Sequence, residues 1–232
     1  MSEVLGYVLV FSLVVATVGV VYTTGLGGLQ DAAETASVTN AERALIFLDD
    51  DLEALVTGEA STRATEIDVT NGAIGFGPPV TVTVTGGPAA SVTARLTPIV
   101  YRPDRASGAV VAANGAVFRQ RGGAAVPIED PTTTIGPTSV VTIVRTRTRD
   151  DGIANGGRVL VRTAVTTRSV YHLQTNGTAT ISITSPRAEA WAAVLSDATG
   201  TDCVATGGTA TCTVSTAEVY VQVVTIRTTL SA

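Results

Sequence analysis

The chain has 232 residues, of which 45% are hydrophobic and only 15% are charged, so it can bury a sizeable core and does not have the composition of a disordered protein. All 15 basic residues are arginines, and the formal net charge is -5. Binding to nucleic acid requires clustered positive charge, so this composition argues against nucleic acid as a partner. The mild acidity and the absence of lysine fit a halophilic source.

The first predicted element is a long apolar helix. Between Glu3 and Asp31 the chain has no charged residue, and residues 4–22 are almost wholly apolar. A helix of about 20 such residues is long enough to cross a bilayer core. A cleavable secretory signal would begin with basic residues and have a shorter apolar stretch, whereas the first basic residue here is Arg43. We therefore expect residues 4–22 to anchor the protein in a membrane, with the rest of the chain outside the cell.

A second, amphipathic helical segment is expected to follow the first. Residues 29–56 are rich in helix formers, place their apolar residues mostly at helical spacing, and carry acidic residues on the remaining surface. Gly25, Gly27 and Gly28 lie between the two segments. Glycine inside a helix costs about 1 kcal/mol relative to alanine, so these residues indicate either a joint or a place of close helix packing. We favour a break near residues 25–28.

The opening Ser-Glu-Val-Leu-Gly, followed by an apolar helix and then an amphipathic one, resembles the start of archaeal type IV pilins and related haloarchaeal surface proteins. In that family a membrane-embedded peptidase removes a short basic leader, and the apolar helices pack into the core of a filament. The resemblance implies that Glu3 contacts the terminal amine of a neighbouring subunit. The alternative is that Glu3 is a solvated residue at a membrane interface.

The remaining residues, 58–232, predict a β-rich head domain. Short runs rich in Thr and Val alternate between apolar and polar residues, which is typical of half-buried strands. Asn114-Gly115 between two apolar runs predicts a tight hairpin. Strands joined by short turns predict a mainly antiparallel β-sandwich. One short helix is expected near residues 186–197, after Ser185-Pro186, with Trp191 on its buried side.

The predicted fold class is therefore α+β, in two units. The first unit, residues 1–57, is the transmembrane or filament-core helix with its amphipathic extension. The second, residues 58–232, is the extracellular head.

Cys203 and Cys212 are predicted to form a disulfide across a β-hairpin. A two-residue turn at Gly207-Gly208 places the two cysteines opposite each other at a non-hydrogen-bonded position, where the Cα separation suits a disulfide. A metal site would need two further ligands, and the chain has one histidine, His172, and no other cysteine. An even number of cysteines also favours an oxidising location for the head.

Asn176 begins an Asn-Gly-Thr acceptor sequence in a polar turn between two predicted strands. We expect this turn to be exposed and regard Asn176 as a candidate glycosylation site.

Arg145, Arg147 and Arg149 alternate with threonine, so all three are expected to project from one face of a strand. The simplest interpretation is the solvated outer face of a sheet. The alternative is an ionic contact strip for an acidic surface, such as the carboxylate-rich helical segment of a neighbouring subunit or an anionic glycan. Because surface ion pairs are individually weak, such a strip would orient a partner more than it would bind it.

The sequence contains no recognisable catalytic or phosphate-binding motif, and the acidic run at residues 49–51 lacks the spacing of a calcium loop. We therefore expect no enzymatic activity, cofactor, metal site or small-molecule substrate. The favoured function is a pilin-like structural subunit of a cell-surface filament or assembly that self-associates through its N-terminal helix. The alternative is a monomeric surface protein that the apolar helix anchors in the membrane.

Overall fold

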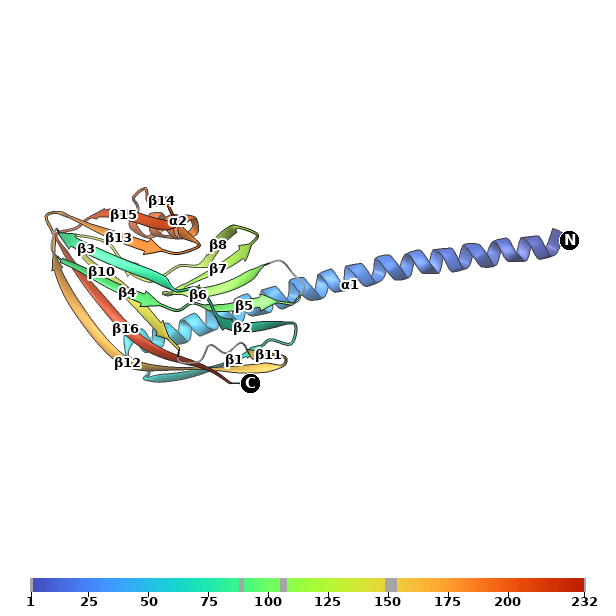
Figure 1. Cartoon of the computed structure of the whole chain (residues 1–232), viewed down its shortest axis with the longest axis horizontal. Helices are drawn as coiled ribbons and strands as arrows, with labels where there is room; N and C mark the ends of the chain where they lie inside the picture. The colour runs from blue at the N-terminus through green and yellow to red at the C-terminus, as the bar shows by residue number, and fades with distance from the viewer. Residues whose placement is uncertain (1, 88–89, 105–107, 149–153, 232) are drawn as a thin grey trace.

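The computed structural model describes residues 2–87, 90–104, 108–148 and 154–231, without the side chains of residues 2, 3, 5, 23–31 and 34. One long helix projects from a β-rich head, and its C-terminal part enters that head (Figure 1). The elements in chain order are α1 (Ser2–Thr57), β1 (Thr62–Asp68), β2 (Gly72–Phe76), β3 (Val80–Gly87), β4 (Ala90–Leu96), β5 (Ile99–Pro103), β6 (Ala109–Ala113), β7 (Ala116–Arg121), β8 (Ala124–Glu129), β9 (Thr133–Thr134), β10 (Thr138–Arg147), β11 (Ala154–Asn155), β12 (Arg158–Gln174), β13 (Thr178–Thr184), α2 (Ala188–Thr199), β14 (Val204–Thr206), β15 (Thr209–Ser215) and β16 (Glu218–Ser231).

Helix α1 is continuous from Ser2 to Thr57, so the predicted break near residues 25–28 is wrong. Glycine weakens a helix by about 1 kcal/mol per residue but does not forbid the helical conformation. Once a helix has been nucleated, each further residue adds a hydrogen bond, so good helix formers on both sides carry the helix across the glycines.

The prediction of a membrane-spanning segment is also wrong. Among the residues that the structure describes, no helix combines the length and the apolar character needed to cross a membrane. The expectation of a membrane-anchored protein fails with it.

The head contains three sheets rather than the predicted sandwich. The first has the strand order β1-β12-β16-β10-β9, the second β11-β2-β5-β6-β7-β8, and the third β14-β15-β13-β3-β4. Neighbouring strands are antiparallel except β10 and β16, which are parallel. Alternation of apolar and polar residues predicts that a strand exists but not which strand it pairs with, which is why the sequence did not indicate the number of sheets.

The short helix expected near residues 186–197 is present as α2. Its buried residues belong to the largest apolar cluster of the head, which we call the main core. Trp191 on this helix is only 1% exposed, and its ring meets the ring of Phe118 edge to face with a centroid distance of 4.8 Å. Such aromatic pairs add to the stabilisation that burial alone provides. Trp191 is therefore a core anchor, as the sequence suggested.

Candidate functional site: the exposed half of the N-terminal helix

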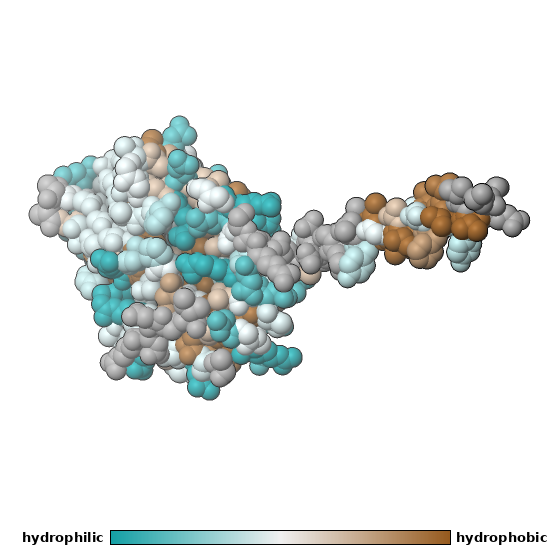
Figure 2. Space-filling view, turned by 45° about the vertical axis from the view of Figure 1, so that its right-hand side comes forward, coloured by the Kyte–Doolittle hydropathy of each residue, from teal (hydrophilic) through white to brown (hydrophobic). Residues whose placement is uncertain are grey.

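The N-terminal half of α1 is an apolar rod outside the head. Every described residue in the range 4–22, which we call the apolar segment, is exposed. Figure 2 shows hydrophobic residues gathered on this part of the helix, well away from the head. Soluble monomers rarely expose contiguous apolar surface larger than a few hundred Å², and larger patches mark interaction sites. The apolar segment is therefore the candidate functional site.

The apolar surface surrounds the helix completely. The consecutive residues Val8, Leu9, Val10 and Phe11 are 55–68% exposed. Successive residues of an α-helix point about 100° apart, so four in a row cover the whole circumference. A helix that packs against one partner needs only an apolar stripe, whereas a helix that is apolar all round is suited to burial on every side.

Two further features of the apolar segment concern its threonine and its glycines. The Thr17 hydroxyl donates hydrogen bonds to the carbonyl oxygens of Leu13 and Val14, at 3.0 and 2.9 Å, so it is satisfied by its own helix. At Gly6 and Gly19, an added Cβ would meet nothing within 4 Å. Each glycine weakens the helix by about 1 kcal/mol relative to alanine, and no described atom lies where an alanine Cβ would clash. Close approach by another helix would account for both.

The C-terminal half of α1 differs because it is built into the head. Residues 37–57, which we call the docked segment, contribute Ala41, Leu45 and Leu48 to one buried cluster that includes Ile74 and Tyr101. Leu52 and Leu55 belong to a second cluster with Val144, Val224 and Ile226 of the first sheet. The head therefore packs against the docked segment on more than one side. This packing fixes the direction in which the apolar segment projects.

Polar contacts lock the docked segment in place. The buried carboxylate of Glu42 accepts hydrogen bonds from both Nε and Nη2 of Arg119 on β7, and this pairing raises the pKa of Arg119. Asp51 accepts a hydrogen bond from the hydroxyl of Thr65 at 2.7 Å. At the end of the helix, the guanidinium of Arg168 donates to the carbonyl oxygen of Leu55. A cation at this position complements the helix dipole.

The predicted site residue Glu3 lies within α1, but its side chain is outside the described residues. Asn176 is exposed in the turn between β12 and β13. Its exposure agrees with an acceptor site, and its glycosylation remains a prediction.

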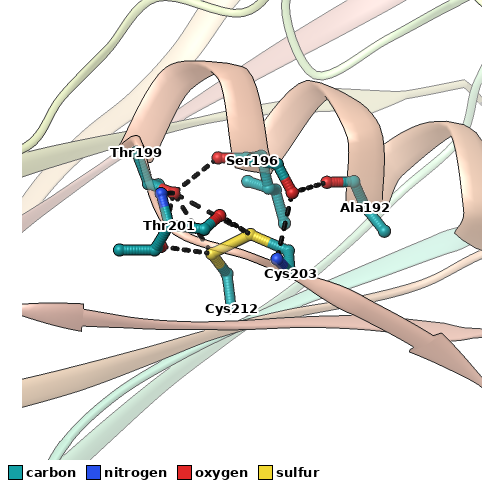
Figure 3. Close-up of a disulfide and its surroundings, with 7 residues drawn as sticks. Ala192, Ser196, Thr199, Thr201, Cys203 and Cys212 are labelled. Carbon is teal, nitrogen blue, oxygen red and sulfur yellow. Dashed lines mark hydrogen bonds between the residues drawn. A yellow bond between two sulfur atoms is a disulfide. The ribbon is translucent and has the colours of Figure 1, made fainter.

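The predicted disulfide between Cys203 and Cys212 is present, with a Cα separation of 4.5 Å. The register of β14 and β15 pairs Val204 with Thr211 and Thr206 with Thr209, around a turn in which Gly207 and Gly208 have positive φ. The backbone N–H of Cys203 also donates to the Ser196 hydroxyl at 3.0 Å, so the bridge lies against the end of α2 (Figure 3). The disulfide closes the hairpin, and the hydrogen bond to Ser196 connects the hairpin to α2.

The arginine strip extends further than the sequence indicated. Arg145 and Arg147 lie on one face of β10, whereas Arg149 is outside the described residues. The parallel register places Arg147 beside Arg227 of β16, and Arg162 of β12 pairs with Thr229, two residues further along β16. No ion pair within the described residues involves Arg145, Arg147, Arg162 or Arg227, which together we call the arginine face.

A second charged surface, which the sequence did not indicate as a unit, lies beside the docked segment. A cavity of about 300 Å³ is lined by the five carboxylates of Asp49, Asp50, Glu53, Glu129 and Asp130, which we call the acidic cleft. Asp49 Oδ1 is buried without a hydrogen-bond partner among the described residues. Burial, together with the charges of Glu129, Asp50 and Glu53, raises the pKa of Asp49 to about 7.

Helical spacing accounts for two of the carboxylates in the acidic cleft. Asp49 and Glu53 are four residues apart and therefore share one side of α1. Glu129 and Asp130 come from β8 and the loop after it, and only the tertiary fold brings them to the helix. Among the described residues, no group of three or more His, Cys, Asp or Glu side chains is arranged to hold a metal ion.

Comparison with known proteins identifies a family but no characterised relative. No curated protein and no solved structure matches the chain. A family model described as a family of unknown function, DUF7289, matches residues 1–229, which is almost the entire chain, so the match covers both the helix and the head. The protein therefore belongs to the DUF7289 family of unknown function.

Proposed function

We propose that this protein is a pilin-like structural subunit whose apolar segments pack together to form the core of a filament or a similar assembly. The observation that carries the proposal is the exposure of apolar side chains around the whole circumference of α1 over residues 4–22. Packing of several such helices would bury this surface on every side, and each fully buried Val, Leu or Phe side chain contributes about 1.5–3 kcal/mol.

The division of α1 into two halves supports the same proposal. The docked segment is fixed by two apolar clusters and by the ion pair between Glu42 and Arg119. A rigid connection of this kind would hold each head at a defined angle to the helix core, as a regular assembly requires. The N-terminal region of archaeal type IV pilins also consists of an apolar helix followed by an amphipathic one, and this chain resembles them in that respect.

The alternative of a monomeric membrane-anchored protein is not retained, since no described helix meets the requirements of a membrane span. A monomer in water would leave the apolar segment exposed. Self-association resolves this problem without a membrane.

Electron microscopy of the purified full-length chain after removal of detergent tests the proposal. We expect regular assemblies of uniform diameter for the natural sequence. The double variant Phe11→Asp, Val14→Asp should remain dispersed, because two buried carboxylates would be costly in a helix core. Val126→Asp is the matched control, since Val126 is a 59% exposed valine on the head, and it should assemble normally.

Amorphous precipitate from the natural sequence, or regular assembly of the Phe11→Asp, Val14→Asp variant, would contradict the proposal. Far-ultraviolet circular dichroism of the variant in detergent checks that α1 and the head are intact. Such a check separates loss of assembly from loss of folding.

A further inference from the structure

Two surfaces of the head carry opposite charge, and none of the ion pairs within the described chain neutralises the acidic cleft or the arginine face. The arginine face lies at the end of the first sheet beyond the part that the third sheet covers. The residues that precede it on the same face of β10 and β16, such as Val141, Ile143 and Val221, are buried in the main core. Arg147 and Arg227 are both exposed.

The cations of the arginine face are crowded. Neighbouring strands are about 4.8 Å apart, so the paired positions Arg147 and Arg227 place two cationic side chains on adjacent strands and on one face of the sheet. Arg162 and Arg227 both line a groove of about 570 Å³, in which the one carboxylate, that of Asp51, pairs with Arg63. Burial and the nearby charge of Arg147 lower the pKa of Arg145. Like charges in adjacent strands are unfavourable, so an anionic partner would stabilise this surface.

The acidic cleft has an excess of negative charge. None of the residues that line it is basic. Within the described chain, the only hydrogen bond that Glu53 receives from another element comes from the Thr132 hydroxyl at 3.1 Å, and Asp49 Oδ1 receives none. A guanidinium group presents several N–H donors in a planar fork that matches carboxylate geometry, so arginine is a suitable partner for this cleft.

The two surfaces face opposite sides of the first sheet. Thr142 and Val144 of β10 line the acidic cleft, whereas Arg145 and Arg147 alternate with them and point to the other side. A contact between these surfaces therefore cannot form within one chain. Between copies it would be heterologous, with a different surface on each side, and such contacts add subunits in one direction instead of closing into a dimer.

We infer that neighbouring copies of this chain contact each other through their heads, with the arginine face of one copy against the acidic cleft of the next. The inference rests on the proposed function, because exposed ion pairs are individually worth only about 0–1 kcal/mol. Packing of the apolar segments would raise the effective concentration of neighbouring heads to about the millimolar range, at which weak contacts are occupied. The ionic contact then sets the orientation of the heads while the helices supply the affinity.

Charge reversal in the full-length chain tests the contact. One variant reverses the cleft with Asp50→Arg and Glu53→Arg, and a second reverses the arginine face with Arg147→Glu and Arg227→Glu. All four residues are exposed, so both variants are expected to fold. Each variant alone would place like charges against each other, whereas an equimolar mixture restores opposite charges at every contact. The control reverses two exposed charges elsewhere, Arg121→Glu and Glu189→Arg.

The readout is a site-specific disulfide between heads. The substitutions Thr57→Cys, in the acidic cleft, and Thr229→Cys, in the groove that Arg227 lines, are placed singly in separate chains of each background, and the two native cysteines are already paired. We expect rapid cross-linking in a mixture of the two, at least tenfold slower cross-linking when either charge-reversed background is used for both chains, and recovery when the two backgrounds are mixed. The control background should behave as the natural one.

Equal cross-linking in all backgrounds, or failure of the mixed backgrounds to recover, would overturn the head contact. If the filaments of the natural chain persist in that case, the proposed function stands and only the head contact fails. If the natural chain forms no filaments but the mixed backgrounds still cross-link at high concentration, the head contact stands and the proposed function fails. Calorimetric titration of calcium chloride that shows tight binding, lost in the Asp50→Arg, Glu53→Arg variant, would instead make the cleft a cation site and overturn the contact.

Discussion

The two halves of α1 have the same backbone conformation but opposite relations to the rest of the molecule. Leu45 in the docked segment is fully buried, whereas Leu13 in the apolar segment is 65% exposed. The docked segment has apolar residues on the sides that meet the sheets and acidic residues elsewhere, while the apolar segment has no charged side at all. The head buries the apolar sides of the docked segment, whereas the rest of the described chain leaves the apolar segment exposed. In the proposed assembly, the apolar segments of other chains would cover it.

The largest expected effect is a difference in the free energy of unfolding of the head between variants of these two leucines. Leu45→Ala should lower the free energy of unfolding of the head by about 2–5 kcal/mol, because it leaves a cavity in a closed core. Leu13→Ala should change it by less than about 0.5 kcal/mol, since the side chain touches no part of the head. Chemical denaturation of both variants in the same detergent measures the difference. Equal destabilisation would break the distinction between the two halves.

A smaller effect is expected for the ion pair that locks the docked segment. Arg119→Ala would leave the buried Glu42 carboxylate without its two donors, and we expect a loss of about 1–3 kcal/mol in the free energy of unfolding. Arg121, two residues further along β7, is exposed and forms no ion pair within the described chain. Arg121→Ala should therefore cost no more than about 0.5 kcal/mol. A cost for Arg121→Ala as large as that for Arg119→Ala would show that the pair does not lock the helix.

The smallest expected effect concerns the pH dependence of docking. The pKa of Asp49 is about 7 in the folded chain against an ordinary value of 3.8, so the folded state holds this proton more tightly than the unfolded state. Stability should therefore fall as pH rises from about 4 to about 7 and then level off. Asp49→Asn should flatten this slope and stabilise the head by about 1–2 kcal/mol at pH 8.

Unfolding transitions of the natural chain and of Asp49→Asn, recorded between pH 4 and pH 8, provide the measurement. Asp68 does not complicate this window. The hydroxyl and the N–H of Thr70 lower its pKa below 3.8, so its contribution is lost only at lower pH. A natural chain whose stability rises between pH 4 and pH 7 would contradict the account of Asp49.

The sequence predicted those features that depend on neighbouring residues. The hairpin at Asn114-Gly115, the short helix around Trp191 and the bridge between Cys203 and Cys212 follow from turn chemistry and local spacing, and all three are present. The continuity of α1 across residues 25–28 was missed because local propensity does not report the cooperativity of a long helix.

Features that depend on distant pairing could not be predicted. The parallel register of β10 and β16 brings Arg227 beside Arg147, and no local pattern links these two residues. Likewise, Glu129 joins Asp49 only because the fold brings the end of β8 to the cavity that Asp49 lines. Both charged surfaces of the head are therefore products of the fold rather than of sequence motifs.

The most direct test of the central claim is the rate of thiol labelling at the apolar segment in assembled protein. Val14→Cys and Val126→Cys each introduce a single free thiol at a valine that is more than half exposed in the isolated chain. In assembled full-length protein, we expect the thiol at position 14 to react at least tenfold more slowly than the thiol at position 126, with equal rates after denaturation. Equal rates in the assembled protein would show that the apolar segment stays in contact with water, and would contradict the account.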